Sequence, residues 1–185
     1  MARLSAVSIH PLPSMQTSKS VVVIDTSILC VWLKIPGLET CGPDRNRWDF
    51  ERVDREIRFH ITSRMSLILP LTTIIETGNH IAKSAGERFA LAGELARVMN
   101  KAADAESPWA AFSEQSERWT PENLKRLAQE WPPLAAQKMS IGDATIKEVA
   151  DYYAKMGCSV TLLTGDQQLA AYQPAPSPMV PRRRK

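Results

Sequence analysis

Cysteine is scarce in this chain, and its spacing argues against two classes of protein. The three cysteines, Cys30, Cys41 and Cys158, are an odd number, are widely spaced and include no C-x-x-C pair. A disulfide framework needs cysteines that can pair, and a structural zinc site needs closely spaced ligands. We therefore expect neither of these, and a reducing cytoplasmic location is the simplest interpretation.

Long apolar runs are also missing from the sequence. No stretch approaches the roughly 20 apolar residues that a membrane-spanning helix needs. Residues 1–18 are interrupted by Pro11 and Pro13, and they lack the apolar segment of a secretory signal. We therefore expect a protein without a membrane partner.

The sequence also has little excess of either charge. It contains 23 Lys and Arg residues and 20 Asp and Glu residues, which give a net charge of +3 at pH 7. Such a balance permits a polyanionic partner without requiring one. The hydrophobic share of 44% over 185 residues is enough for one folded domain. We expect that domain over residues 19–173, between a flexible N-terminal extension (1–18) and a Pro-rich basic tail (174–185).

A run of β-branched residues that ends at an acid is the most informative feature that is present. Residues 21–24 (Val-Val-Val-Ile) are all β-branched, and Asp25 follows them directly. Four such residues without alternation predict a strand that is buried on both faces, as in the parallel sheets of α/β proteins. Because ligands gather at the carboxyl ends of parallel strands, Asp25 stands where a functional site is expected.

Further strands alternate with helices along the chain. Residues 66–70 and 158–163 are typical of two more short buried strands. Apolar spacing and capping signals predict a helix over residues 45–63 and two further helices that begin at Thr73 and at Gly86. They also predict a helix from Thr120 that ends at Trp131-Pro132-Pro133, and one from Ser140 to Gly157. This order predicts the α/β class, with a single domain in which helices flank a mostly parallel central sheet.

Three more acids occupy positions comparable to that of Asp25. Glu76 lies on the helix just after the second strand, Asp143 begins the last long helix, and Asp166 follows the third strand. Carboxylates that converge without a cation repel one another and raise their own pKa values, so Mg²⁺ or Mn²⁺ is the natural occupant of such a pocket. Such an ion lowers the pKa of a bound water, which can then attack a phosphodiester.

Each acid also has a purely structural interpretation. Glu76 and Asp143 each lie three residues after a Thr or a Ser, as in a capping box. Asp166 could belong to an ordinary turn before a short helix, and Asp25 could accept hydrogen bonds from nearby backbone amides. The sequence leaves both interpretations open for each residue taken singly.

The joint pattern resembles the PIN-domain family. The resemblance spans roughly residues 20–172 and lies in four segments in the family's order, namely residues 21–27 (VVVIDTS), 69–76 (LPLTTIIE), 141–146 (IGDATI) and 160–166 (VTLLTGD). It implies a PIN-like α/β fold and an Mg²⁺- or Mn²⁺-dependent ribonuclease. It further implies that the metal-binding and catalytic residues are Asp25, Glu76, Asp143 and Asp166, with Thr26 and Thr164 as polar supports.

The resemblance leads to a hypothesis about function and to two alternatives. We expect a metal-dependent endoribonuclease that hydrolyses RNA phosphodiester bonds. The family includes the toxins of bacterial toxin–antitoxin pairs, so an antitoxin protein and a homodimer are candidate partners besides RNA. The first alternative is a catalytically silent PIN-like scaffold that binds RNA or a protein. The second, a haloacid-dehalogenase-like phosphatase, is disfavoured because Ser27 stands where that family expects an acid.

Together with the N-terminal extension, the insert 35–64 makes the chain longer than a compact toxin of this family. It contains four arginines that could bind an RNA backbone, because arginine pairs well with phosphate. These arginines are Arg45, Arg52, Arg55 and Arg58. The interleaved acids Glu51, Asp54 and Glu56 make a solvated, salt-bridged helix face an equally good interpretation.

Two smaller points stay open in the sequence. His80 lies one turn after Glu76, and it could touch a phosphate or simply lie on the helix surface. The family also has a strand in the region between Ala110 and Trp119, and no strand pattern is legible there.

Overall fold

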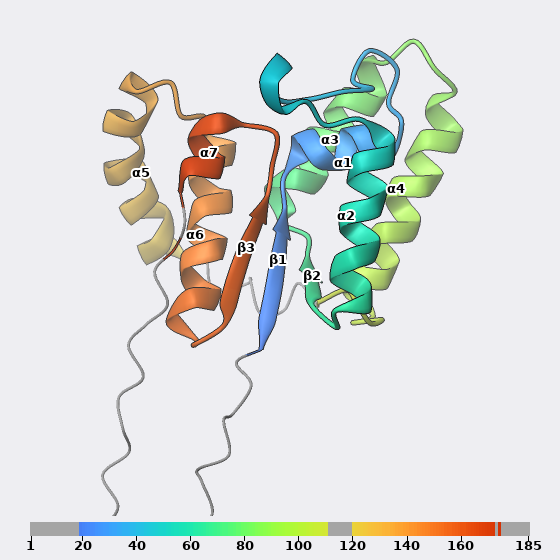
Figure 1. Cartoon of the computed structure of the whole chain (residues 1–185). Coiled ribbons are helices and arrows are strands. Elements are labelled where there is room, and N and C mark those ends of the chain that lie inside the picture. Colours follow the sequence, from blue (N-terminus) through green and yellow to red (C-terminus); the bar gives the residue numbers. More distant parts are fainter. Residues whose placement is uncertain (1–18, 111–119, 173, 175–185) are drawn as a thin grey trace, which may run out of the picture.

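Three parallel strands form a sheet at the centre of the structure, a computed structural model that describes residues 19–110, 120–172 and 174. The strand order is β2-β1-β3, and both strand pairs are parallel. Helices cover both faces of this sheet (Figure 1). The predicted α/β class with a parallel central sheet flanked by helices is confirmed. The predicted extension (1–18) and almost all of the predicted tail (174–185) lie outside the described residues.

The strands and helices alternate along the chain as the sequence pattern predicts. The strands are β1 (Ser20–Ile24), β2 (Ser66–Ile68) and β3 (Ser159–Leu163). The helices are α1 (Thr26–Trp32), the 3-10 helix η1 (Asp44–Asn46), α2 (Phe50–Thr62), α3 (Leu71–Lys83), α4 (Arg88–Ala103), α5 (Pro121–Ala136), α6 (Ile141–Lys155) and α7 (Gln167–Ala171). Over the described part of the chain, none of these helices combines the length and the apolar character needed to cross a bilayer.

The central strand β1 is buried on both faces, as predicted. Val22 and Ile24 belong to an apolar cluster formed with α1, α2, α3 and α4, whereas Val21 and Val23 belong to a second cluster formed with α6 and α7. None of these four side chains is exposed. Because apolar burial is the main driving force of folding, packing on both faces fixes β1 and the residue at its carboxyl end, Asp25.

The arginine-bearing helix begins later than predicted. The sequence places it over residues 45–63, but α2 is capped by Asp49, whose side chain accepts a backbone hydrogen bond at 2.9 Å. The physical reason is a contact outside the helix, because Trp48 pairs with Cys41 in an antiparallel bridge and keeps this stretch extended. Arg45 therefore lies in η1 and not on α2.

Helix α5 ends later than predicted. The sequence predicts a helix end at Trp131-Pro132-Pro133, but α5 continues through both prolines to Ala136. The two missing proline N–H groups leave the carbonyls of Ala128 and Gln129 without helical partners. Both of these residues are exposed, so water can bond to their carbonyls and lower the cost of the prolines.

An extended segment continues the sheet beyond β2. Trp109 forms a parallel bridge with Leu67. The Leu67 N–H donates to the Pro108 carbonyl at 2.8 Å, and the Ala110 N–H donates to the Leu67 carbonyl at 3.0 Å. The strand that the family resemblance places here falls mainly on residues 111–119, which lie outside the described residues. The pairing of Trp109 and Ala110 with Leu67 places the start of this predicted strand region, at Ala110, beside β2.

Candidate functional site

A pocket of about 280 Å³ opens at the carboxyl edge of the sheet, and all four predicted acids line it. Asp25 follows β1, Asp166 comes shortly after β3, Glu76 lies on α3, and Asp143 lies in the first turn of α6. The parallel sheet brings these segments together, because its strands end at the same edge. The other lining residues are Thr26, Ser27, Cys30, Leu38, Thr40, Cys41 and His80.

Asp25 is the most deeply placed of the four acids, with 5% of its surface exposed. Its Oδ2 accepts hydrogen bonds from Ser27 Oγ at 2.6 Å and from Thr164 Oγ1 at 2.7 Å, and its Oδ1 accepts one from the Thr26 N–H at 2.6 Å. Burial raises the pKa of Asp25 above its ordinary value of 3.8, and the negative charge of Asp143 adds to the rise. The three hydrogen bonds oppose this rise in pKa because they stabilise the ionised form.

Glu76 is held by a hydroxyl from a different helix. Thr26 Oγ1 donates a hydrogen bond of 2.7 Å to Glu76 Oε2. Thr73 does not cap α3, because α3 begins at Leu71 and the Thr73 hydroxyl donates to the Ile24 carbonyl at 3.0 Å. The capping-box interpretation of Glu76 is therefore wrong, and Thr73 instead ties α3 to the end of β1.

Asp143 forms the predicted capping box and also lines the pocket. Its Oδ2 accepts hydrogen bonds from the Ser140 N–H at 3.2 Å and from the Ser140 hydroxyl at 2.7 Å. The Asp143 N–H donates to Ser140 Oγ at 2.9 Å. Because both bonds to the carboxylate use Oδ2, the capping role does not remove the side chain from the pocket.

Asp166 caps α7 and is linked to Asp25 through a shared hydroxyl. Its Oδ1 accepts a hydrogen bond from the Leu169 N–H at 2.8 Å, as a helix cap does. Its own N–H donates at 2.9 Å to Thr164 Oγ1, the hydroxyl that donates to Asp25. One hydrogen-bond network therefore joins the carboxyl ends of β1 and β3.

A histidine and two cysteines complete the pocket wall. His80 is exposed, and it is the one basic side chain among the described residues that line the pocket. Burial raises the pKa of Cys30 to about 12 and also raises the pKa of Cys41. Both thiols therefore stay protonated at neutral pH and are poor nucleophiles. No sequence signal places Cys41 near the acids, because a loop between α1 and η1 brings it there.

None of the four arginines that were predicted to bind RNA lines the acidic pocket. Arg58 pairs with Asp54 at 2.6 Å on α2, and Arg52 Cζ lies 3.7 Å from the centroid of the Trp48 ring. The salt-bridged helix face that the sequence also permitted is thus present in part. RNA binding stays a prediction for Arg45, Arg52, Arg55 and Arg58.

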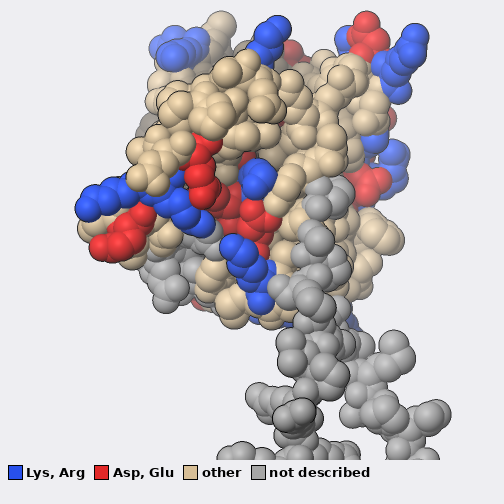
Figure 2. All heavy atoms as spheres, turned by 90° about the vertical axis from the view of Figure 1, so that its left-hand side faces the viewer, with Lys and Arg blue, Asp and Glu red and all other residues tan. Residues whose placement is uncertain are grey.

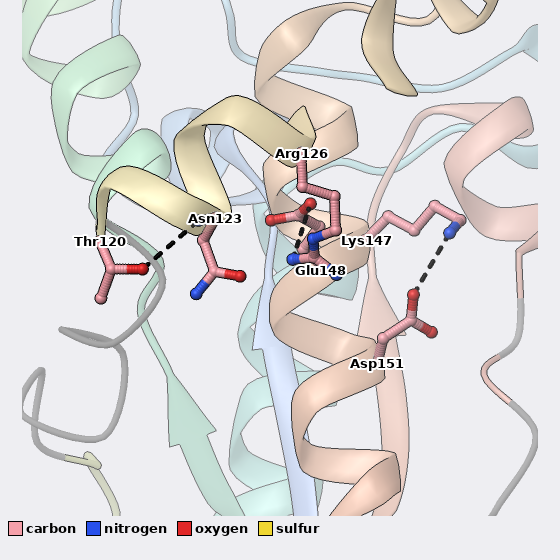
Figure 3. Close-up of polar contacts among 6 residues, drawn as sticks. All are labelled: Thr120, Asn123, Arg126, Lys147, Glu148 and Asp151. Carbon is pink, nitrogen blue, oxygen red and sulfur yellow. Dashed lines mark hydrogen bonds and ion pairs between the residues drawn. The ribbon is translucent and has the colours of Figure 1, made fainter. Parts of the chain in front are cut away.

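Acidic and basic side chains also meet on the face of the molecule that α5 occupies (Figure 2). There, Arg126 of α5 pairs with Glu148 of α6 at 3.4 Å, and Lys147 pairs with Asp151 at 3.2 Å (Figure 3). Asp151 also accepts a hydrogen bond from the Tyr172 hydroxyl. These acids already have partners and do not line the acidic pocket, so they are not further candidates for its metal site.

The donor set of the pocket suits a hard divalent cation. Carboxylate oxygens are the ligands that Mg²⁺ and Mn²⁺ prefer, and a cation would offset both causes of the raised pKa of Asp25. In the part of the chain that the structure describes, no three His, Cys, Asp or Glu side chains stand close enough together to hold an ion.

Replacing Thr164 with valine is expected to destabilise the protein through Asp25. Valine has a similar shape but lacks the hydroxyl that donates to Asp25 and accepts from the Asp166 N–H. Leaving a buried polar group without its partner costs about 1–3 kcal/mol, and we expect a loss of that size in the free energy of unfolding. Urea denaturation at pH 7 without divalent ions measures it. Thr164→Ser keeps the hydroxyl and should lose less, so equal losses would contradict this role.

Comparisons of the chain with protein-family models, with curated proteins and with solved structures found no match. They therefore neither support nor oppose the PIN-domain resemblance. That resemblance rests on the four sequence segments, whose acids the fold brings to one pocket.

Proposed function

We propose that this chain is a metal-dependent endoribonuclease of the PIN-domain type, which hydrolyses RNA phosphodiester bonds. The supporting observation is that four carboxylates from four separate segments line one pocket at the carboxyl edge of a parallel sheet. These are the acids of the four segments that resemble the PIN-domain family. A pocket with this many negative charges repels a phosphate group unless cations offset them, which is the condition that a metal-dependent nuclease meets.

The residues of the pocket have distinct roles in this proposal. Mg²⁺ or Mn²⁺ would be held by Asp25, Glu76, Asp143 and Asp166, and when bound it would supply Lewis-acid activation of water and of the leaving oxygen. Thr26 orients the Glu76 carboxylate and Thr164 orients that of Asp25, each through a hydrogen bond of 2.7 Å. Asp25 is buried and fixed, whereas Asp166 is exposed at the rim where a substrate strand would enter.

A catalytically silent scaffold is the second candidate, and one observation favours it. Three of the four acids cap helices, because Asp25 caps α1, Asp143 closes the capping box of α6 and Asp166 caps α7. Acids that cap helices contribute to stability, so they would be kept even in a domain that only binds RNA or a protein. An antitoxin protein or a second copy of the chain, the partners that the resemblance implies, would suit either candidate.

Incubation of the purified full chain with a mixed panel of end-labelled RNAs separates the two candidates. We expect cleavage with Mn²⁺ or Mg²⁺, none with a chelator, and none from the Asp25→Asn/Asp143→Asn double variant. Both replacements have nearly the same shape as the natural residues, and circular dichroism checks that the variant is folded. If folded wild-type protein cuts no RNA and binds no Mn²⁺ in calorimetry, the nuclease is rejected and the scaffold is favoured.

A further inference from the structure

Gly142, in the first turn of α6, lies directly against the carboxylate of Glu76. A Cβ atom at this position would overlap Glu76 Oε1, and it would lie 3.0 Å from Cδ and 3.3 Å from Oε2. These three atoms are the nearest ones that such a Cβ would meet, and all belong to Glu76. Gly142 is buried, so the Glu76 carboxylate occupies the space that a side chain at position 142 would need.

The other oxygen of the Glu76 carboxylate accepts a hydrogen bond from α1. Thr26 Oγ1 donates to Glu76 Oε2 at 2.7 Å, and Thr26 itself is buried. The carboxylate therefore lies between the first turns of α1 and α6, and helix N-termini favour a negative charge. Asp143 is the next residue after Gly142, so the Glu76 carboxylate lies against the turn of α6 that contains Asp143.

The backbone conformation gives no separate reason for a glycine at position 142. The residue lies within α6, and it is not among the residues of the described chain with a positive φ. Glycine is a poorer helix former than alanine, so the helix alone would favour a side chain here. The group that a Cβ would displace is the far end of a flexible side chain and not backbone, so we expect an alanine variant to fold.

We propose that Gly142 is a positioning residue for the acidic pocket. Because Gly142 has no side chain, the Glu76 carboxylate can lie against the first turn of α6, and both Glu76 and Asp143 of that turn line the pocket. The consequence for cleavage rests on the proposed ribonuclease function. The consequence for the placement of Glu76 does not, because it depends only on the contact between α3 and α6.

A double-mutant cycle tests the contact without any need for activity. Gly142→Ala is introduced into the wild-type chain and into a Glu76→Ala chain, and thermal unfolding is followed in a chelator. We expect Gly142→Ala to raise the unfolding midpoint more in the Glu76→Ala chain, where no carboxylate obstructs the new methyl group. Equal shifts in the two chains would overturn the proposal.

Gly93 offers a matched control. It lies inside α4, and a Cβ there would meet nothing within 4 Å. Gly93→Ala therefore reports the helix preference for alanine alone, and its shift in midpoint should be the same with and without Glu76. The proposal would also be overturned if the shift in midpoint caused by Gly93→Ala differed between the wild-type and Glu76→Ala chains as much as the shift caused by Gly142→Ala.

Cleavage and metal affinity test the consequence for the site. A catalytic group misplaced by about 1 Å can cost on the order of 100-fold in rate, and we expect Gly142→Ala to lower kcat by about that factor. Weaker Mn²⁺ binding in calorimetry should accompany the loss, while Gly93→Ala should match the wild type in both. Full activity of Gly142→Ala would overturn the positioning role. Inactive wild-type protein would count against the ribonuclease, and the unfolding cycle would then decide this proposal by itself.

Discussion

Replacing Asp25 with asparagine (Asp25→Asn) is expected to lower cleavage about 100- to 1,000-fold, as removal of one preorganised group from an active site typically does. The same variant is expected to make the metal-free protein more stable at pH 7. Asp25 is buried, and burial together with Asp143 raises its pKa, so its charge is unfavourable in the folded state. Asparagine has the same shape, and its amide can accept from the Thr26 N–H and donate to the hydroxyls of Ser27 and Thr164.

The pH dependence of this gain follows from the direction of the pKa shift. Folding raises the pKa of Asp25, so the folded protein binds more protons than the unfolded chain between the unfolded pKa of about 3.9 and the folded pKa. The contribution of Asp25 to the free energy of unfolding therefore falls as pH rises through this window. Asp25→Asn has no such group, so its advantage over the wild type should be full above the folded pKa and should disappear below about pH 4.

Urea unfolding between pH 4 and pH 8 in a chelator measures this difference. Asp104→Asn is a control for the removal of an acid outside the pocket, because Asp104 is exposed at the end of α4. Added Mn²⁺ should stabilise the wild type and not Asp25→Asn, since a ligand stabilises only the state that binds it. A variant that is less stable than the wild type at both ends of the pH range would contradict the unfavourable buried charge.

The position of Asp25 could be predicted because its signal is local. Residues 21–24 are β-branched without alternation, which requires apolar contacts on both faces, and the structure supplies them from two clusters. Once this strand is central, parallel pairing sets the end of β3 beside it, and the chain after β3 leads to Thr164 and Asp166. The sequence therefore predicts the edge of the sheet and two of the four acids, Asp25 and Asp166, from their positions just after strands.

The walls of the pocket could not be predicted, because they depend on contacts distant in sequence. Cys41 faces the acids because it pairs with Trp48 and packs against Gly165, and neither contact has a sequence pattern. The same pairing delays the start of α2. Gly142 was visible in the sequence only as part of a motif, and its role depends on a side chain from α3 that no local pattern connects to it.

The structural and functional interpretations of the acids are not exclusive. From the sequence, a structural role and a pocket role are alternatives for Asp143, as part of a capping box, and for Asp166, as part of a turn. The structure shows that each side chain caps a helix and lines the pocket at once, because a carboxylate has two oxygens and a cap needs only one of them. The capping hydrogen bonds hold each carboxylate in one orientation. Helices that begin at the same edge of a sheet can therefore fix the positions of several acids in one pocket.

Ile24→Ala is expected to have the largest effect on stability among changes close to the pocket. Ile24 is fully buried in the cluster shared with α1 to α4, and truncation of a buried isoleucine to alanine costs about 2–5 kcal/mol. Its carbonyl accepts the hydrogen bond from Thr73 that ties α3 to β1. A cavity at this point should therefore loosen the placement of Asp25 relative to Glu76, and cleavage should fall even where the variant remains folded.

Ile57→Ala separates lost stability from a displaced site. Ile57 is equally buried in the same cluster, but it lies on α2, which contains none of the four acids. Both variants should lose stability by a similar amount in urea, whereas cleavage at a temperature where both are folded should fall only for Ile24→Ala. Ile24→Val, which costs about 0.5–1.5 kcal/mol, should retain most of the cleavage. If Ile24→Ala and Ile57→Ala cleave RNA equally well, the end of β1 does not fix the pocket through Ile24, and the hydrogen bonds from Thr164 and Ser27 must be sufficient to hold Asp25.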